Sequence, residues 1–148
     1  MLRIIKVIFL IILVLGFANL LKFDKIISYM KYPKISKKNI NYFIENLGVA
    51  NVLYDHDSIE SYSKDQTEDL VFPPEVVLKP SKTEEVSNIL SYCNNNSIPV
   101  TACGGRTGLS GGSLPVFGGV ALSLEKFNSI IEIDERNLQA TVEPGVIN

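Results

Sequence analysis

The strongest constraint on this chain of 148 residues is a glycine-dense run that directly follows an apolar segment. The run reads Gly104-Gly105-Arg106-Thr107-Gly108-Leu109-Ser110-Gly111-Gly112. Glycine adopts positive φ angles without steric cost, so such a run can turn repeatedly and direct several backbone N–H groups at one point. Consecutive N–H groups form a concave anion site, to which Thr107 and Ser110 add hydroxyl donors and Arg106 adds positive charge. The run is therefore predicted to be a loop that binds a phosphate group.

The segments before the glycine run place it in an arrangement of strands and helices. Residues 75–78 and 98–101 predict two short strands, and Ser81 and Glu84 match a capping box at the start of a helix between them. The apolar stripe of this helix consists of Val86, Ile89, Leu90 and Cys93. Strand, helix and strand in this order predict a parallel βαβ unit. Ligands of open α/β sheets bind beyond the carboxyl ends of the strands, where the glycine run begins.

The rest of the chain predicts one further helix and three further strands. A helix is expected to begin at Ser36 and end at Gly48, with an apolar stripe made of Ile40, Phe43, Ile44 and Leu47. Residues 49–70 are expected to be irregular, apart from a polar helical turn within residues 55–62. Alternation predicts half-buried strands at residues 119–124, 130–133 and 139–143, with a tight turn at residues 134–137.

The residues around the glycine run exclude three better-known nucleotide loops. A P-loop requires a lysine after its last glycine, and no lysine lies between Lys82 and Lys126. A Rossmann fingerprint opens a helix, whereas Leu114-Pro115 and Gly118-Gly119 interrupt any helix here. Residues 109–113 resemble the signature of ABC-transporter ATPases, but that chemistry needs the missing P-loop. A glycine-rich turn without a ligand is the remaining alternative.

The composition excludes several classes of partner. A net charge of −2 and a pI of about 5.4 give no basic patch, so no nucleic acid is expected to bind. Cys93 and Cys103 form no C-x-x-C pair and the chain has no histidine cluster, so neither a disulfide framework nor a metal site is expected. His56 lies in a polar stretch and is predicted to be an exposed residue without a catalytic role.

The N-terminal region contains an apolar segment. Residues 7–21 read VIFLIILVLGFANLL, slightly short of the ~20 residues that span a bilayer. Residues 1–30 are predicted to form a membrane-anchor helix, with a cleaved signal peptide and a buried core helix as the open alternatives. The lysines that follow the segment, at positions 22, 25, 31, 34, 37 and 38, outnumber Arg3 and Lys6 before it. The positive-inside rule therefore places the soluble part in the cytoplasm; after signal cleavage it would instead be exported.

Several motifs, taken in order along the chain, resemble one family. They are Tyr62-Ser63-Lys64-Asp65, Pro74-Glu75-Val76-Val77, Ser81-Lys82-Thr83-Glu84-Glu85-Val86, Ile98-Pro99-Val100-Thr101, Gly104 to Gly112, Leu122-Ser123-Leu124 and Val142-Glu143-Pro144-Gly145-Val146. This ordered set resembles the vanillyl-alcohol oxidase/p-cresol methylhydroxylase (PCMH-type) flavoproteins. Within that family it is similar to the branch of the glycolate oxidase FAD subunit and the D-lactate and D-2-hydroxyacid dehydrogenases.

The resemblance implies an α+β fold, the N-terminal portion of a PCMH-type FAD-binding domain. It implies that the FAD pyrophosphate is held by Gly104, Gly105, Arg106, Thr107, Gly108, Leu109, Ser110 and Gly111, with Pro144 and Gly145 near the ribityl chain and flavin ring. The bound flavin would accept a hydride from C2 of a hydroxy acid of the glycolate or D-lactate type. Asp65 and Glu143 are hydrogen-bonding candidates by resemblance.

The chain departs from the family pattern around the glycine run. Relatives commonly have Pro-Arg at the positions of Ala102-Cys103 and glycine at the position of Arg106, so Arg106 could replace the charge of the lost arginine. Relatives that attach flavin covalently use a histidine near the position of Thr107, and non-covalent FAD is therefore expected. Cys103 is predicted to be a small packed residue rather than an attachment point.

The chain is much shorter than the family members, which place their substrate-binding residues in a C-terminal part. Residues 31–72 are expected to form a basic linker and helical lead-in, and residues 73–148 a truncated FAD-binding domain that contains no catalytic residue. The expected function is the FAD-binding portion of a 2-hydroxy acid oxidoreductase that acts with a separately encoded C-terminal part. A non-catalytic membrane-tethered remnant and a stand-alone phosphate-binding module are the alternatives.

Overall fold

The computed structural model describes residues 32–67 and 69–147. The chain divides into two units between Lys31 and Tyr32, and the described residues belong to the second. The helix predicted within residues 1–30 lies outside these ranges. In the part that is described, no helix is long and apolar enough to cross a membrane.

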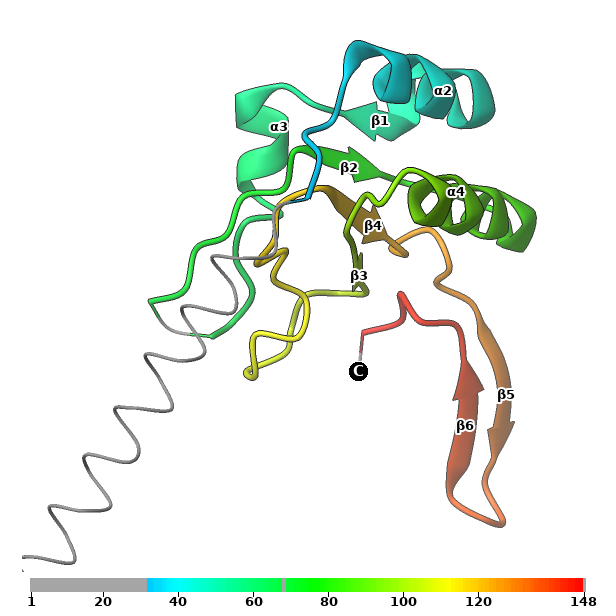
Figure 1. Cartoon of the computed structure of the whole chain (residues 1–148). Helices are drawn as coiled ribbons and strands as arrows, with labels where there is room; N and C mark the ends of the chain where they lie inside the picture. The colour runs from blue at the N-terminus through cyan, green and yellow to red at the C-terminus, as the bar shows by residue number, and fades with distance from the viewer. Residues whose placement is uncertain (1–31, 68, 148) are drawn as a thin grey trace, which may run out of the picture. The chain divides into compact units, whose positions relative to one another are not determined.

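A four-stranded sheet forms the centre of the second unit (Figure 1). Its strands are β1 (Val52–Leu53), β2 (Val76–Leu78), β3 (Val100–Cys103) and β4 (Val120–Ser123), in the order β1-β2-β4-β3. Strands β2 and β3 both run parallel to β4, and β1 pairs antiparallel with β2. The predicted parallel βαβ unit is confirmed in direction, but β4 lies between its two strands. The two-residue strand β1 falls in the segment predicted to be irregular.

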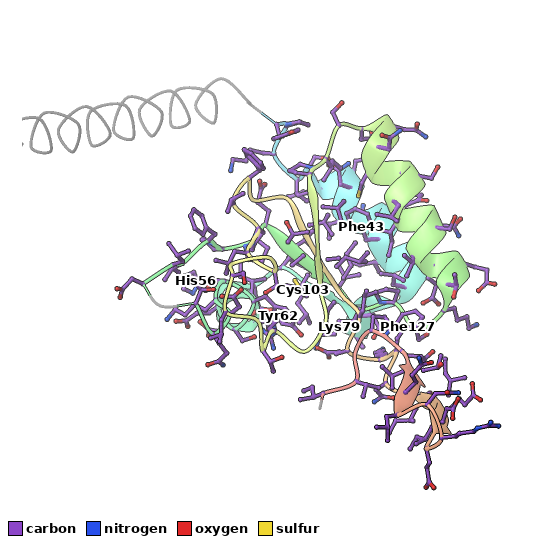
Figure 2. All side chains as sticks on the ribbon, turned by 90° about the horizontal axis from the view of Figure 1, so that it is seen from below. Phe43, His56, Tyr62, Lys79, Cys103 and Phe127 are labelled. Atoms are coloured by element: carbon purple, nitrogen blue, oxygen red, sulfur yellow. The ribbon has the colours of Figure 1, made fainter. Side chains whose placement is uncertain are left out.

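Alternate side chains of the central strands pack on opposite faces of this sheet. One face packs against helices α2 (Lys37–Leu47) and α4 (Thr83–Asn95); its buried residues include Phe43, Leu47, Val76, Leu78, Ile89, Cys93, Val120 and Leu122. The other face contains Tyr62, Val77, Cys103 and Ala121. Figure 2 shows Phe43 beside the two helices and Tyr62 and Cys103 away from them. Strand β4 is consequently buried on both faces, whereas alternation predicted it to be half-buried.

Local signals in the sequence determine both ends of α2. The Ser36 hydroxyl accepts a hydrogen bond from the Asn39 amide at 3.3 Å, as expected of an N-cap residue. Gly48 follows the last helical residue with φ 81, a conformation that other residues rarely adopt. The predicted helix is confirmed, and the polar turn that follows it is the short helix α3 (His56–Glu60).

Helix α4 departs from its prediction in two details. Its capping carboxylate belongs to Glu85 rather than Glu84, because Glu85 Oε2 accepts from the Ser81 and Lys82 amides at 2.7 and 3.3 Å. Leu90 was assigned to the apolar stripe, but it is 45% exposed. The ring of Tyr92 packs against the core instead and stacks on Tyr42 with centroids 3.7 Å apart.

The last two strands form a sheet of their own. Strands β5 (Ile130–Asp134) and β6 (Gln139–Val142) make an antiparallel hairpin, with Asp134 paired to Gln139. The predicted hairpin is confirmed, but its side chains are exposed instead of half-buried. Ile131 and Ile133 expose 65% and 66% of their surface. A two-stranded sheet has too few neighbours to bury a face.

Candidate functional site

The segments that follow β2, β3 and β4 all begin at the same end of the sheet. Because β2, β3 and β4 are parallel, the residues that follow them gather at their carboxyl ends. Lys79 follows β2, the glycine run begins directly after β3, and Glu125 lies two residues beyond β4. The sheet therefore places the predicted phosphate loop beside two charged side chains.

The structure brings the two predicted cofactor-binding segments into contact. A Cβ atom added to Gly104 would lie 2.6 Å from the carbonyl oxygen of Pro144, and one on Gly105 would lie 2.7 Å from Cγ1 of Ile147. The Gly145 amide donates to the Phe127 carbonyl at 2.7 Å, which holds this segment near the end of β4. Only residues without a side chain allow the two backbones to approach this closely.

The middle of the glycine run is supported by the segment before β2. The Gln66 amide donates to the Gly108 carbonyl at 3.1 Å, and the Gly111 amide donates to the Thr67 hydroxyl at 2.7 Å. Within residues 32–67 and 69–147, no acceptor is found for the backbone amides of residues 104–110. The Gly111 amide, by contrast, is bonded to the Thr67 hydroxyl.

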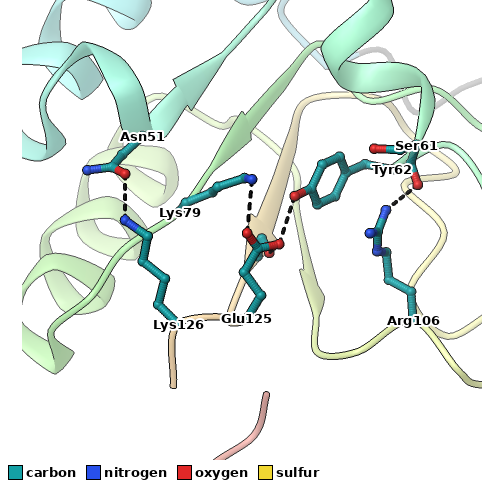
Figure 3. A network of polar contacts seen from close by, with 8 residues as sticks. Asn51, Ser61, Tyr62, Lys79, Arg106, Glu125 and Lys126 are labelled. Carbon is teal, nitrogen blue, oxygen red and sulfur yellow. Dashed lines mark hydrogen bonds and ion pairs between the residues drawn. The ribbon is translucent and has the colours of Figure 1, made fainter. Parts of the chain in front are cut away.

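The side chain of Arg106 contacts the segment that follows helix α3. Its guanidinium carbon lies 4.0 Å from the centroid of the Tyr62 ring, and Nη1 donates to the Ser61 carbonyl (Figure 3). The Arg106 backbone has φ 56, the left-handed region that glycine adopts more easily. In this structure the positive charge predicted for the anion site is therefore directed at Tyr62.

The structure also contains a polar network around Glu125, beside the loop, which the sequence did not predict. Glu125 Oε1 pairs with Lys79 Nζ at 2.9 Å, while Oε2 accepts from the hydroxyls of Tyr62 at 2.8 Å and Ser123 at 2.9 Å (Figure 3). Burial tends to raise the pKa of Glu125, but the hydrogen bonds from Lys79, Tyr62 and Ser123 outweigh it, so the pKa is lowered. One signal was available, since Lys79 and Glu125 each stand just after a predicted apolar strand.

The remaining residues singled out in the sequence lie in different environments. Asp65 accepts from the Thr67 amide at 2.8 Å, a bond that lowers the pKa of the Asp65 carboxyl. Glu143 Oε2 accepts from the Ser129 amide at 2.8 Å. Cys103 is fully buried, as predicted for a packed residue, and His56 is exposed as predicted. Among the described residues, no group of His, Cys, Asp and Glu is arranged to hold a metal ion.

Comparison with known proteins identifies the family of this chain. Residues 74–148 match the family described as FAD binding domain. The glycolate oxidase subunit GlcD of Bacillus subtilis is 44% identical over 86 residues, which are 58% of this chain and 18% of that protein. The mitochondrial D-2-hydroxyglutarate dehydrogenase of Arabidopsis thaliana is 35% identical over 116 residues, 78% of this chain and 21% of that protein. The D-lactate dehydrogenase of Anaerostipes hadrus is 35% identical over 128 residues, 81% of this chain and 25% of that protein.

Solved structures show the same fold. A p-cresol methylhydroxylase with bound substrate superposes with a TM-score of 0.64 at 34% identity, covering 74% of this chain and 22% of the other. An alkyldihydroxyacetonephosphate synthase superposes with the same TM-score at 14% identity, covering 80% of this chain and 24% of the other, and shows the fold alone. The chain spans about a fifth to a quarter of the length of these relatives.

Proposed function

This chain belongs to the FAD binding domain family, and from that premise we propose that it is the FAD-binding portion of an oxidoreductase acting on a 2-hydroxy acid. The substrate class rests on the relatives, whose names give glycolate, D-lactate and D-2-hydroxyglutarate. All three are 2-hydroxy acids.

The observation that carries the proposal is the contact between Gly104 and Pro144. It places the glycine run and the Pro144-Gly145 segment side by side, with no room for a Cβ atom at Gly104. The run contains no acidic side chain, and the amides of residues 104–110 have no acceptor among the described residues. Such a set of donors fits a diphosphate.

Two segments of the chain would hold different parts of the cofactor. The amides of residues 104–110 and the hydroxyls of Thr107 and Ser110 would bind the diphosphate, and Pro144-Gly145 would border the flavin end. Bound flavin supplies the acceptor for the hydride of the hydroxy acid. The thiol of Cys103 is fully buried, which fits non-covalent binding of the flavin.

The direct test is a titration of the purified full chain with FAD, followed by equilibrium dialysis and the yellow flavin absorbance. Saturable binding that ADP competes away, and that acid precipitation reverses, is the expected result. A chain that takes up no FAD at any concentration used would refute the proposal and favour the non-catalytic remnant. Binding of inorganic phosphate without FAD would favour the stand-alone phosphate module.

We also propose that turnover requires a second, separately encoded polypeptide that supplies the substrate site. The exposed apolar side chains of the β5–β6 hairpin support this, because Ile131, Ile133 and Leu138 expose 65%, 66% and 91% of their surface. The test is co-expression with the product of the adjacent downstream reading frame, followed by dye reduction with glycolate, D-lactate and D-2-hydroxyglutarate. Full activity of the chain alone would contradict the requirement.

For localisation, we propose a membrane anchor at residues 7–21 with the rest of the chain in the cytoplasm. The support is the apolar composition of that segment and the excess of lysines after it. Protease treatment of intact and inverted membrane vesicles tests the orientation. Recovery of a shortened chain outside the cell would instead indicate a cleaved signal peptide.

A further inference from the structure

The segment from Ser61 to Thr67 runs along the glycine loop and contacts it repeatedly. Its contacts are Ser61 and Tyr62 with Arg106, Gln66 with Gly108, Thr67 with Gly111, and Asp65 with the Ser113 hydroxyl at 3.2 Å. The two segments are about 44 residues apart in sequence at the Thr67 contact. The sequence predicted residues 63–67 to be an irregular loop and placed Ser61 and Tyr62 in the polar helical turn before it.

Tyr62 is the fixed point of these contacts. Its side chain is only 3% exposed, and its hydroxyl donates to Glu125 at 2.8 Å. Glu125 is in turn paired with Lys79 at 2.9 Å. Because Lys79 and Glu125 follow β2 and β4, the position of the Tyr62 ring is fixed by the sheet.

Arg106 transmits that position to the loop. Its guanidinium carbon lies 4.0 Å from the centroid of the Tyr62 ring, and its Nη1 donates to the carbonyl of Ser61, the residue that follows helix α3. Its backbone has φ 56, which a residue with a Cβ atom rarely adopts without compensating contacts. The contacts with the Tyr62 ring and the Ser61 carbonyl are of this kind.

We propose that residues 61–67 preform the glycine loop, and that Arg106 is a positioning residue acting through Tyr62 rather than a ligand of the diphosphate. This inference rests on the proposed function for its ligand. The claim that residues 61–67 order the glycine loop concerns the chain before any ligand binds. It can therefore be refuted independently of the proposed FAD binding.

The first test is hydrogen exchange of peptides covering residues 104–112 in the full chain without ligand. Arg106→Ala and Tyr62→Leu should each speed exchange by about fivefold, the scale of one lost cation–π contact. The double variant should exchange no faster than either single variant, because both remove the same contact. Tyr62→Phe keeps the ring but loses the bond to Glu125, so it should speed exchange by less than Tyr62→Leu does. Arg136→Ala should leave exchange unchanged, because its arginine lies in the exposed hairpin turn.

The second test compares the Arg106→Ala and Arg106→Gly variants. Glycine accepts φ 56 without strain, so Arg106→Gly should weaken FAD binding less than Arg106→Ala does. A direct phosphate ligand would instead make Arg106→Gly lose as much FAD affinity in the Tyr62→Leu background as in the parent chain, because the lost charge then acts independently of Tyr62. Arg106→Gly is unstrained at φ 56, so it can be measured in both backgrounds even if Arg106→Ala is too unstable to purify.

Other outcomes would overturn this proposal or the proposed function. Unchanged exchange in Arg106→Ala, with a loss of FAD affinity that persists in the Tyr62→Leu background, would overturn the proposal and make Arg106 a ligand. Failure of the parent chain to bind FAD would refute the proposed function, while the exchange data would still decide whether Tyr62 and Arg106 order the loop.

Discussion

Lys79 Nζ lies 2.9 Å from Glu125 Oε1, so an ion pair joins the segments that follow strands β2 and β4. The pair is partly exposed, with side-chain exposures of 22% for Lys79 and 39% for Glu125. Water therefore screens it, and its contribution to the free energy of unfolding is small. Its importance lies in fixing Glu125, which receives the Tyr62 hydroxyl.

The pH dependence of this pair gives the first prediction. The folded pKa of Glu125 is lowered from its ordinary value of 4.5, so its stabilising effect is present above that value and is lost as pH falls through the folded pKa. Glu125→Gln should lower the free energy of unfolding by about 1 kcal/mol or less near neutral pH. Urea titrations should show this difference shrinking below about pH 4.5.

Lys34→Met is the control for that experiment. Lys34 pairs with Glu75 at 3.3 Å, but its side chain is 86% exposed, so no measurable change in stability is expected. A difference between the parent chain and Glu125→Gln that stayed constant down to the acid transition would contradict the prediction.

The second prediction concerns two glycines of the loop. An alanine Cβ at position 104 would lie 2.6 Å from the Pro144 carbonyl, a backbone atom that cannot rotate away. Gly104→Ala should therefore cost about 1–3 kcal/mol of unfolding free energy and weaken FAD binding.

Gly108→Ala is its matched control. A Cβ at position 108 would meet no atom within 4 Å, and the backbone there does not require positive φ. Equal effects of the two substitutions in thermal unfolding would show that the Gly104–Pro144 approach does not constrain the loop.

The third prediction concerns the two cysteines. Both are buried, and burial raises the pKa of Cys93 to about 11. The folded chain should therefore react with a thiol reagent only as fast as it opens, whereas Ser87→Cys on the exposed side of α4 should react at once. Because the unfolded thiol ionises near its ordinary value of 9.0, stability should fall as pH rises above that value. Rapid labelling of Cys93 or Cys103 in the native chain would contradict this.

The fourth prediction uses the hairpin turn. Leu138 is 91% exposed and has φ 53, a conformation that costs about 1–2 kcal/mol for a residue with a Cβ atom. Glycine loses more backbone entropy on folding, by roughly 0.5–1 kcal/mol, so Leu138→Gly should gain about 0.5–1 kcal/mol of unfolding free energy.

Leu109→Gly tests the reason for that gain. Leu109 is 77% exposed but does not have positive φ, so the same replacement should stabilise nothing there. Stabilisation by both substitutions in urea titrations would mean that loss of exposed apolar surface, and not relief at Leu138, is the cause.

Local signals in the sequence predicted most of the secondary structure. The hydroxyl of Ser36 and the glycine at position 48 bracket α2 because each acts on its own few residues. The same reasoning failed at α4 by one residue: the helix begins at Thr83 after the N-cap Lys82, so the third helical residue is Glu85 rather than Glu84. The prediction that Leu90 belongs to the apolar stripe was wrong because the Tyr92 ring packs against the core from a neighbouring face of the helix.

Contacts between distant segments could not be predicted. The insertion of β4 between β2 and β3 leaves no local mark, and alternation therefore suggested a half-buried strand. No local sequence pattern predicts the contact of Tyr62 with Arg106 either. Family resemblance did predict that the glycine run and Pro144-Gly145 act together, and the structure places them in contact. Their binding of FAD stays a prediction.

The strand order β1-β2-β4-β3 has a consequence for how the chain acquires its fold. During synthesis, β2 and β3 leave the ribosome before β4, yet they do not pair with each other and meet only through it. The sheet therefore cannot be completed until residue 123 has been synthesised. The glycine run belongs to the connection that leads from β3 to β4, the strand between β2 and β3. The same stretch of chain therefore closes the sheet and forms the glycine run, so a nascent chain that ends before β4 lacks the strand that joins β2 to β3.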